Sequence, residues 1–155
     1  MTSRAAKEWA ASEVVTASNL NKPAGGAIGW SANSSDQTGL SSSADLTDVS
    51  QEVTVNTSRI VGVFVQGRVG ISSAAADYVG HIQRDASNIG TWALRVGGAN
   101  STAQWESGFA WDTPSAGSHT YSATIARSNG SGLLDVSGTT PSNAKILIID
   151  LGAAS

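Results

Sequence analysis

The chain has 155 residues, enough for one domain with its own core, and 40% of them are hydrophobic while only 14% are charged. Its net charge of −3 offers no basic surface to nucleic acid, and it has no cysteine for disulfides or zinc–thiolate sites. No stretch has the length of a membrane span, and the N-terminal residues lack the apolar core of a secretory signal. We therefore expect no nucleic acid, no membrane partner, no cofactor, and synthesis in a cytoplasm.

Residues 1–26 differ from the rest and predict a separate N-terminal arm, extended and partly helical. A short helix over residues 5–12 and a turn capped by Thr16 are each too short to be stable alone. The Pro-Ala-Gly-Gly sequence at residues 23–26 then predicts a linker. The apolar residues of this arm need a surface, which is either the protein's own domain or a neighbour in an assembly.

Residues 27–155 predict an all-β domain, because short apolar runs alternate with turns rich in glycine, asparagine and serine. The spacing of these runs favours a jelly-roll-like β-sandwich. A short edge strand is expected near residues 44–47, and long strands over residues 59–69 and 101–111. Residues 128–132 predict a hairpin that returns through residues 133–136. Residues 144–152 contain four consecutive aliphatic residues and should lie centrally, since an exposed edge of that composition would aggregate.

Residues 112–122 predict a corner of the sandwich followed by an alternating strand. His119, Tyr121 and the alternate residues after them should face one side. Asp112, Ser118 and His119 share one extended segment, and such neighbours cannot form a catalytic triad by adjacency. We therefore expect His119 to be structural or interfacial.

No metal or catalytic site is predicted elsewhere. His81 and His119 lie in separate predicted strands, which is a weak basis for a metal site. Asp36, Asp45 and Asp48 match no calcium-binding loop. The facing carboxylates of a glycoside hydrolase depend on three-dimensional placement, so a small enzyme of that kind stays as the least favoured alternative.

Trp92, Trp105 and Trp111 lie in predicted strands and allow two interpretations. Large aromatic side chains on strands usually pack in a core or a subunit interface, which is the favoured interpretation. Exposed together, they would form a platform on which sugar rings stack.

Two segments carry a resemblance to a known group of proteins. Trp9, followed by Glu-Val-Val-Thr-Ala-Ser-Asn-Leu-Asn at residues 13–21, resembles the opening of many tail-fibre, minor tail and head-decoration proteins of tailed bacteriophages. The sequences Gly-Ser-His-Thr-Tyr at residues 117–121 and Ile-Ile-Asp-Leu-Gly at residues 148–152 are similar to the closing strands of their β-sandwich domains.

The resemblance implies a non-enzymatic component of the virion, either a capsid decoration or head fibre or a minor tail protein. It implies attachment to other virion proteins through the arm and display of a homo-oligomeric sandwich, with a trimer favoured. Synthesis would take place in the host bacterial cytoplasm, and the alternative function is a glycan-binding module that recognises a receptor. The residues implied in anchoring are Trp9, Glu13, Val14, Val15, Thr16, Leu20 and Asn21.

Overall fold

The computed structural model describes residues 26–42, 44–56, 59–138 and 142–153, so the predicted N-terminal arm lies outside the described residues except for Gly26. Within the described ranges no helix could cross a membrane. The strands are β1 (Ala27–Ala32), β2 (Gln37–Leu40), β3 (Ala44–Val55), β4 (Arg59–Ser72), β5 (Ala76–Arg84), β6 (Ser87–Gly97), β7 (Ser101–Asp112), β8 (Gly117–Gly130), β9 (Leu133–Val136) and β10 (Lys145–Ala153).

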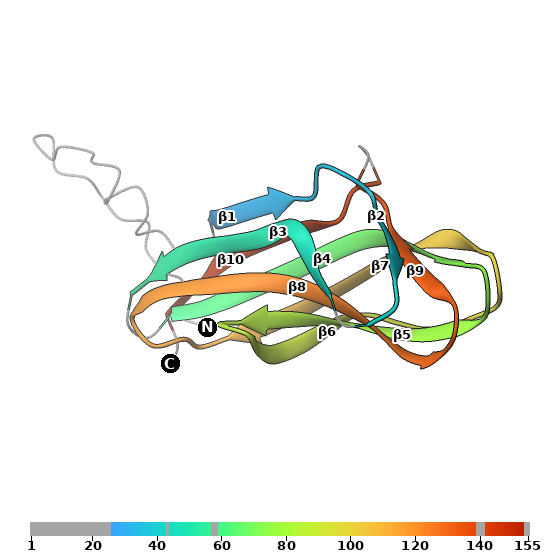
Figure 1. Ribbon diagram of the computed structural model, residues 1–155. Coiled ribbons are helices and arrows are strands. Elements are labelled where there is room, and N and C mark those ends of the chain that lie inside the picture. Colours follow the sequence, from blue (N-terminus) through green and yellow to red (C-terminus); the bar gives the residue numbers. More distant parts are fainter. Residues whose placement is uncertain (1–25, 43, 57–58, 139–141, 154–155) are drawn as a thin grey trace, which may run out of the picture.

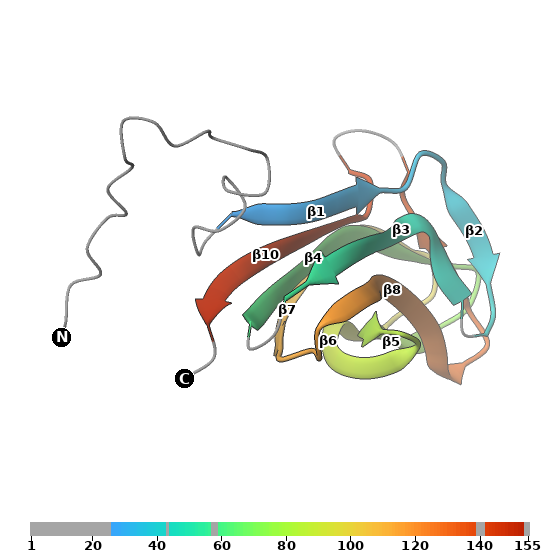
Figure 2. The ribbon, with the colours of Figure 1, turned by 90° about the vertical axis from the view of Figure 1, so that its left-hand side faces the viewer.

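The strands form two curved antiparallel sheets, which Figures 1 and 2 show from two sides. The first sheet runs β1–β10–β4–β7, with β9 beside the far end of β4 and the steeply inclined β2 beside β9. The second sheet runs β3–β8–β5–β6. Without the short strands β2 and β9, this order is that of a jelly roll, in which the first strand pairs with the last and the second with the one before it. The prediction of an all-β, jelly-roll-like sandwich is confirmed.

The core lies between the sheets and explains why the strands alternate as they do. Residues of β4 and β10 that point inward are fully buried, and they meet inward residues of β5 and β8. Strand β10 pairs with β1 on one side and β4 on the other, which confirms the central position predicted for it. The largest members of this core are Trp92, Tyr78, Tyr121, Ile82, Ile125, Leu134, Ile146 and Ile148.

One predicted connection is wrong, and one predicted strand is longer than expected. Residues 128–132 do not join a hairpin, because β8 belongs to the second sheet whereas β9 pairs with β4 and β2 of the first. The N–H groups of Ser131 and Gly132 donate to the carbonyl of Ala75, which guides the chain across to the other layer. The strand expected at residues 44–47 does lie at a sheet edge, but it is the start of the longer strand β3, whose irregularity lies at Asp48, where φ is +63°.

The two sheets meet closely where β6 passes β7, a contact that we call the seam. A Cβ atom added to Gly108 would lie 2.3 Å from both the Thr91 carbonyl oxygen and the Trp92 Cα. The indole of Trp92 packs below Gly80, and its Nε1 donates to the Thr124 carbonyl oxygen at 2.9 Å. The seam therefore leaves no room for a side chain at position 108.

We expect Gly108→Ala to lower the free energy of unfolding by about 1–3 kcal/mol, because the new methyl group would push against backbone atoms that cannot turn away. Gly98→Ala is the matched control, since nothing lies within 4 Å of the Cβ position there. Urea denaturation of both variants measures the difference. Equal stability of Gly108→Ala and the unmodified chain would show that the seam is not tightly packed.

Candidate functional site

The two sides of strand β7 differ from those of an ordinary sandwich strand, because aromatic residues face outward and two acidic residues face inward. Its inward positions carry Glu106, Gly108, Ala110 and Asp112, which register with the inward side of β4. Its outward positions carry Trp105, Ser107, Phe109 and Trp111, and the aromatic residues among them are 53%, 48% and 76% exposed in chain order.

The seam explains why Gly108 and Ala110, on the inner side of β7, are small. Besides the contact at Gly108, a Cβ atom on Gly90 of β6 would lie 2.7 Å from the Ala110 Cβ. Only small residues fit on the inner side of β7 at this place. Packing thus accounts for the small inward residues, but it does not account for large aromatic residues on the exposed side.

The exposed side of the first sheet is ordered in rows that cross the strands. One apolar row runs Trp30, Leu147, Phe64 and Phe109, and it takes one residue from each of β1, β10, β4 and β7. Trp30 is 66% exposed. Directly opposed residues in antiparallel strands are neighbours on one face, so this row is continuous.

A polar row lies beside the apolar one and separates two aromatic positions of β7. It consists of Lys145, Gln66 and Ser107, which oppose one another across β10, β4 and β7. Beyond it, Arg68 opposes Trp105 and donates from Nε to the Ala103 carbonyl oxygen at 3.1 Å. Ser107 and the polar row therefore lie between the rings of Trp105 and Phe109.

The rings at the other end of the face are held by their neighbours. Phe109 and Trp111 meet edge to face, with centroids 6.4 Å apart and planes at 81°. The Phe109 ring and the Leu151 side chain both cover Gly62, where an added Cβ would come within 3.0 and 3.1 Å of them. We call the four exposed rings Trp30, Trp105, Phe109 and Trp111, with the polar row, the aromatic face.

The size of the aromatic face sets it apart from scattered surface residues. An aromatic side chain covers 150–250 Å², so four rings exposed to this degree present on the order of 400–500 Å². The largest apolar patch of a typical monomer is about 300–600 Å² and is often functional. The aromatic face falls in that range.

A pocket of about 200 Å³ opens at the edge of the aromatic face, and Ile89, Phe109, Ala110 and Trp111 line it. Ile89 comes from β6 and the other residues from β7, so the pocket lies on the seam. None of these four side chains carries a charge.

The corner at residues 112–122 forms two separate polar clusters and no triad. Asp112 accepts hydrogen bonds from Arg84, at 2.7 and 2.8 Å, and from the Tyr121 hydroxyl, at 2.9 Å. Burial, together with the bond to Asp112, raises the pKa of Tyr121. Asp112 is thus committed to Arg84 and Tyr121, and it does not orient His119.

His119 belongs to the second cluster. Its Nδ1 lies 2.7 Å from the Asp85 carboxylate and its Nε2 lies 3.0 Å from the Ser115 carbonyl oxygen. Both partners are acceptors, so this arrangement favours the protonated imidazole, in which both ring nitrogens donate. The bond to Asp85 raises the pKa of His119 and, reciprocally, lowers the pKa of Asp85. The pair clamps the β5–β6 turn to the start of β8.

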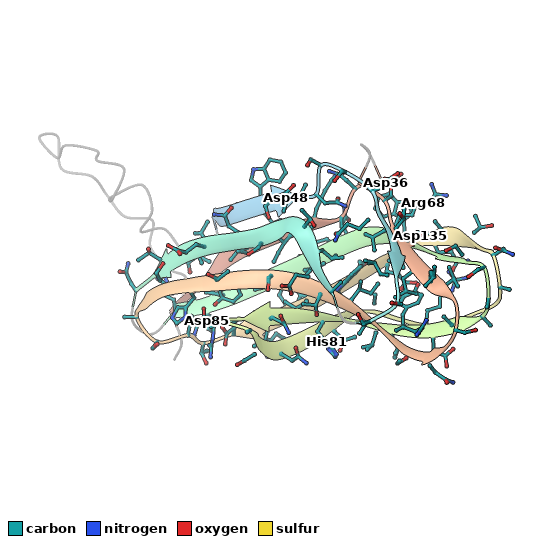
Figure 3. All side chains as sticks on the ribbon, in the orientation of Figure 1. Asp36, Asp48, Arg68, His81, Asp85 and Asp135 are labelled. Carbon is teal, nitrogen blue, oxygen red and sulfur yellow. The ribbon has the colours of Figure 1, made fainter. Side chains whose placement is uncertain are left out.

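The acidic and histidine residues considered for metal binding are spread over the molecule. Asp36 accepts from the Gly138 N–H at 2.6 Å and Asp48 from the Ser34 hydroxyl at 2.9 Å. Figure 3 shows Asp36 near the end that carries β2 and Asp85 toward the opposite end, with His81 on the second sheet. Asp45 is the second residue of β3, and its backbone carbonyl oxygen accepts from the Gln37 side chain at 3.2 Å. Among the described residues, no group of three or more His, Cys, Asp or Glu is placed to hold a metal ion.

The predicted contact residues divide into three groups. Trp105 and Trp111 are exposed on the aromatic face, whereas Trp92 is 2% exposed and is a core residue, so it cannot contact a ligand or a subunit. The predicted anchoring residues lie outside the described part of the chain. Sequence reasoning did not assign Trp30 and Phe109 to the site, although the spacing of Phe109 from Trp111 by two residues gave a signal that they share a face.

Comparisons with known proteins give no family. The chain matches no protein-family profile and no curated protein. Among solved structures, the sugar-binding EclA C-terminal domain is similar with a TM-score of 0.43 and 9% identity, over 73% of this chain and 77% of that one. Dimeric latent PorU from Porphyromonas gingivalis is similar with a TM-score of 0.41 and 7% identity, over 79% of this chain and 13% of that one. CBM35 from Cellvibrio japonicus Abf62 is similar with a TM-score of 0.37 and 11% identity, over 68% of this chain and 71% of that one. At these scores function must be argued from the aromatic face itself.

The clamp between His119 and Asp85 predicts a pH-dependent stability. Because the pKa of His119 is raised in the folded state, the stability that His119 contributes is complete below about pH 6.5. It is lost as the pH rises through the folded-state pKa. Because the pKa of Asp85 is lowered in the folded state, the stability that Asp85 contributes is lost as the pH falls below about 4. We expect the difference in melting temperature between the unmodified chain and His119→Gln to be larger at about pH 5.5 than at about pH 9. His81→Gln is the control, and a difference that is constant with pH would contradict the clamp.

Proposed function

We propose that this protein is a non-catalytic carbohydrate-binding domain that holds an extended glycan on the aromatic face. The observation that carries the proposal is that the aromatic residues of β7 occupy its outward positions and are exposed. Exposing such rings gains nothing for folding, since apolar area is stabilising only when it is removed from water. A ligand that covers these rings on binding accounts for their exposure in the free protein.

The layout of the aromatic face suits a sugar chain in particular. Sugar rings have apolar C–H faces that stack on aromatic rings, and hydroxyl groups that need hydrogen-bond partners at their edges. Trp105 and Trp111 are separated by about 20 Å of strand, enough for several sugar units. Between them, Gln66, Ser107 and Lys145 offer donors and acceptors.

The size of the aromatic face favours a glycan over a stable protein partner. A stable protein–protein interface buries about 800 Å² on each side, roughly twice the area that the exposed rings present. A glycan needs less area, because a few stacked rings and hydrogen bonds fix its position.

The carboxylates support binding without hydrolysis. Glycoside hydrolysis takes two carboxyl groups that flank the scissile bond. The outward positions of the described strands β4, β7 and β10 carry no carboxylate. Glu106 points inward and accepts from the buried Tyr78 hydroxyl at 3.1 Å, while Asp112 is bound to Arg84 and Tyr121.

A second candidate function is that of a structural bacteriophage virion protein, in which copies of this chain associate into a trimer and join other virion proteins. The resemblance at residues 9–21, 117–121 and 148–152 motivates it. The observation that favours it is the aliphatic extension of the face along β10, where Leu147 follows Trp30 and Leu151 is 45% exposed. Sugar stacking does not need these residues, whereas a symmetric contact between copies would bury them.

We expect Trp105→Ala and Trp111→Ala each to weaken glycan binding about tenfold, because each removes one stacking ring. Leu94→Ala is the matched control, since Leu94 is 74% exposed on β6 of the second sheet. A glycan array identifies a ligand, and isothermal titration calorimetry measures the affinities. Far-ultraviolet circular dichroism confirms that the variants are folded.

Two results would decide against the glycan. An array without any bound glycan would contradict the proposal, as would unchanged affinity in both tryptophan variants. If light scattering then showed a trimer that Leu151→Ser dissociates, the face would be a subunit interface of the second candidate function.

A further inference from the structure

The pocket on the seam is continuous with the aromatic face, because Phe109 and Trp111 belong to both. A glycan that stacks on Trp111 therefore runs past the mouth of a cavity of about 200 Å³, lined also by Ile89 and Ala110. A substituent of the sugar next to Trp111 is the group that the pocket can receive. This reasoning rests on the glycan-binding function proposed above.

The lining of the pocket restricts the chemistry of that substituent. Its side chains are aliphatic or aromatic, so a carboxylate, phosphate or sulfate would lose water without gaining a charged partner. A bare hydroxyl group would leave these apolar side chains uncovered. A group that ends in a methyl gains from burial instead.

The edges of the sheets add a polar element to the same place. In the described part of the chain β7 pairs only with β4, and β6 only with β5. The other edge of each strand faces the seam, so its backbone N–H and C=O groups have no partner in a sheet ladder there. An amide can bond to such groups while its methyl end contacts the apolar side chains.

The volume agrees with a substituent and not with a whole sugar. A cavity of about 150 Å³ holds benzene. The pocket is somewhat larger than that, which is ample for an acetamido group but too small for a pyranose ring with its hydroxyls. We propose that the pocket receives the acetamido group of an N-acetylhexosamine unit, so that the ligand is an N-acetylated glycan.

The test compares two ligands that differ only at the predicted position. Oligomers of β-1,4-linked N-acetylglucosamine and of β-1,4-linked glucose have the same backbone and can be matched in length. Calorimetry should show the acetylated oligomer binding about tenfold more tightly to the unmodified chain. Ile89→Phe, which fills the pocket, should remove this preference and keep the weaker affinity for the glucose oligomer.

Each other outcome has one meaning. Equal affinity for the two oligomers, or binding to other glycans on an array but to neither oligomer, overturns this inference and leaves the glycan-binding function standing. No binding to any glycan overturns both. A preference that persists in Ile89→Phe overturns the assignment to this pocket, and Ile89→Ala, which enlarges the pocket, replaces that variant if it does not fold.

Discussion

The close contact between β6 and β7 is the constraint on which the rest of the structure depends. It closes the sandwich along one side, with Gly108 against the Thr91 and Trp92 backbone and the Trp92 indole held by the Thr124 carbonyl oxygen. Small inward residues on β7 are its direct consequence. Because side chains alternate along a strand, the large residues of β7 then occupy the outward positions. The contact thus fixes which residues of β7 face inward and places the pocket, whereas it does not require the outward residues to be aromatic.

The same contact separates the roles of the polar residues. Inside the seam, Glu106 and Asp112 satisfy the hydroxyls of the buried Tyr78 and Tyr121 and thereby help to hold the layers together. Outside it, Gln66, Ser107 and Lys145 oppose one another on the outer side of the sheet, between the exposed rings. The inward polar groups thus contribute to stability, and under the proposed function the outward ones contact the glycan.

Much of the fold was predictable from sequence, because it depends on local alternation. The aliphatic run in β10 indicated a central strand, and the regular turns indicated a jelly roll. The pairing of β9 was not predictable, since it depends on the Ala75 carbonyl oxygen far away in the chain. Trp92 and Trp105 looked alike in sequence, and only the seam decides that one is buried and the other exposed.

The central claim is that the exposed rings, and not the buried one, bind a glycan. Nuclear magnetic resonance of the tryptophan indole N–H groups tests it most directly, with a glycan selected from an array as titrant. The account predicts that the indole signals of Trp105 and Trp111 shift and saturate together, while that of Trp92, bonded to Thr124, stays in place. Signals of Trp105 and Trp111 that do not move while the glycan binds would contradict it.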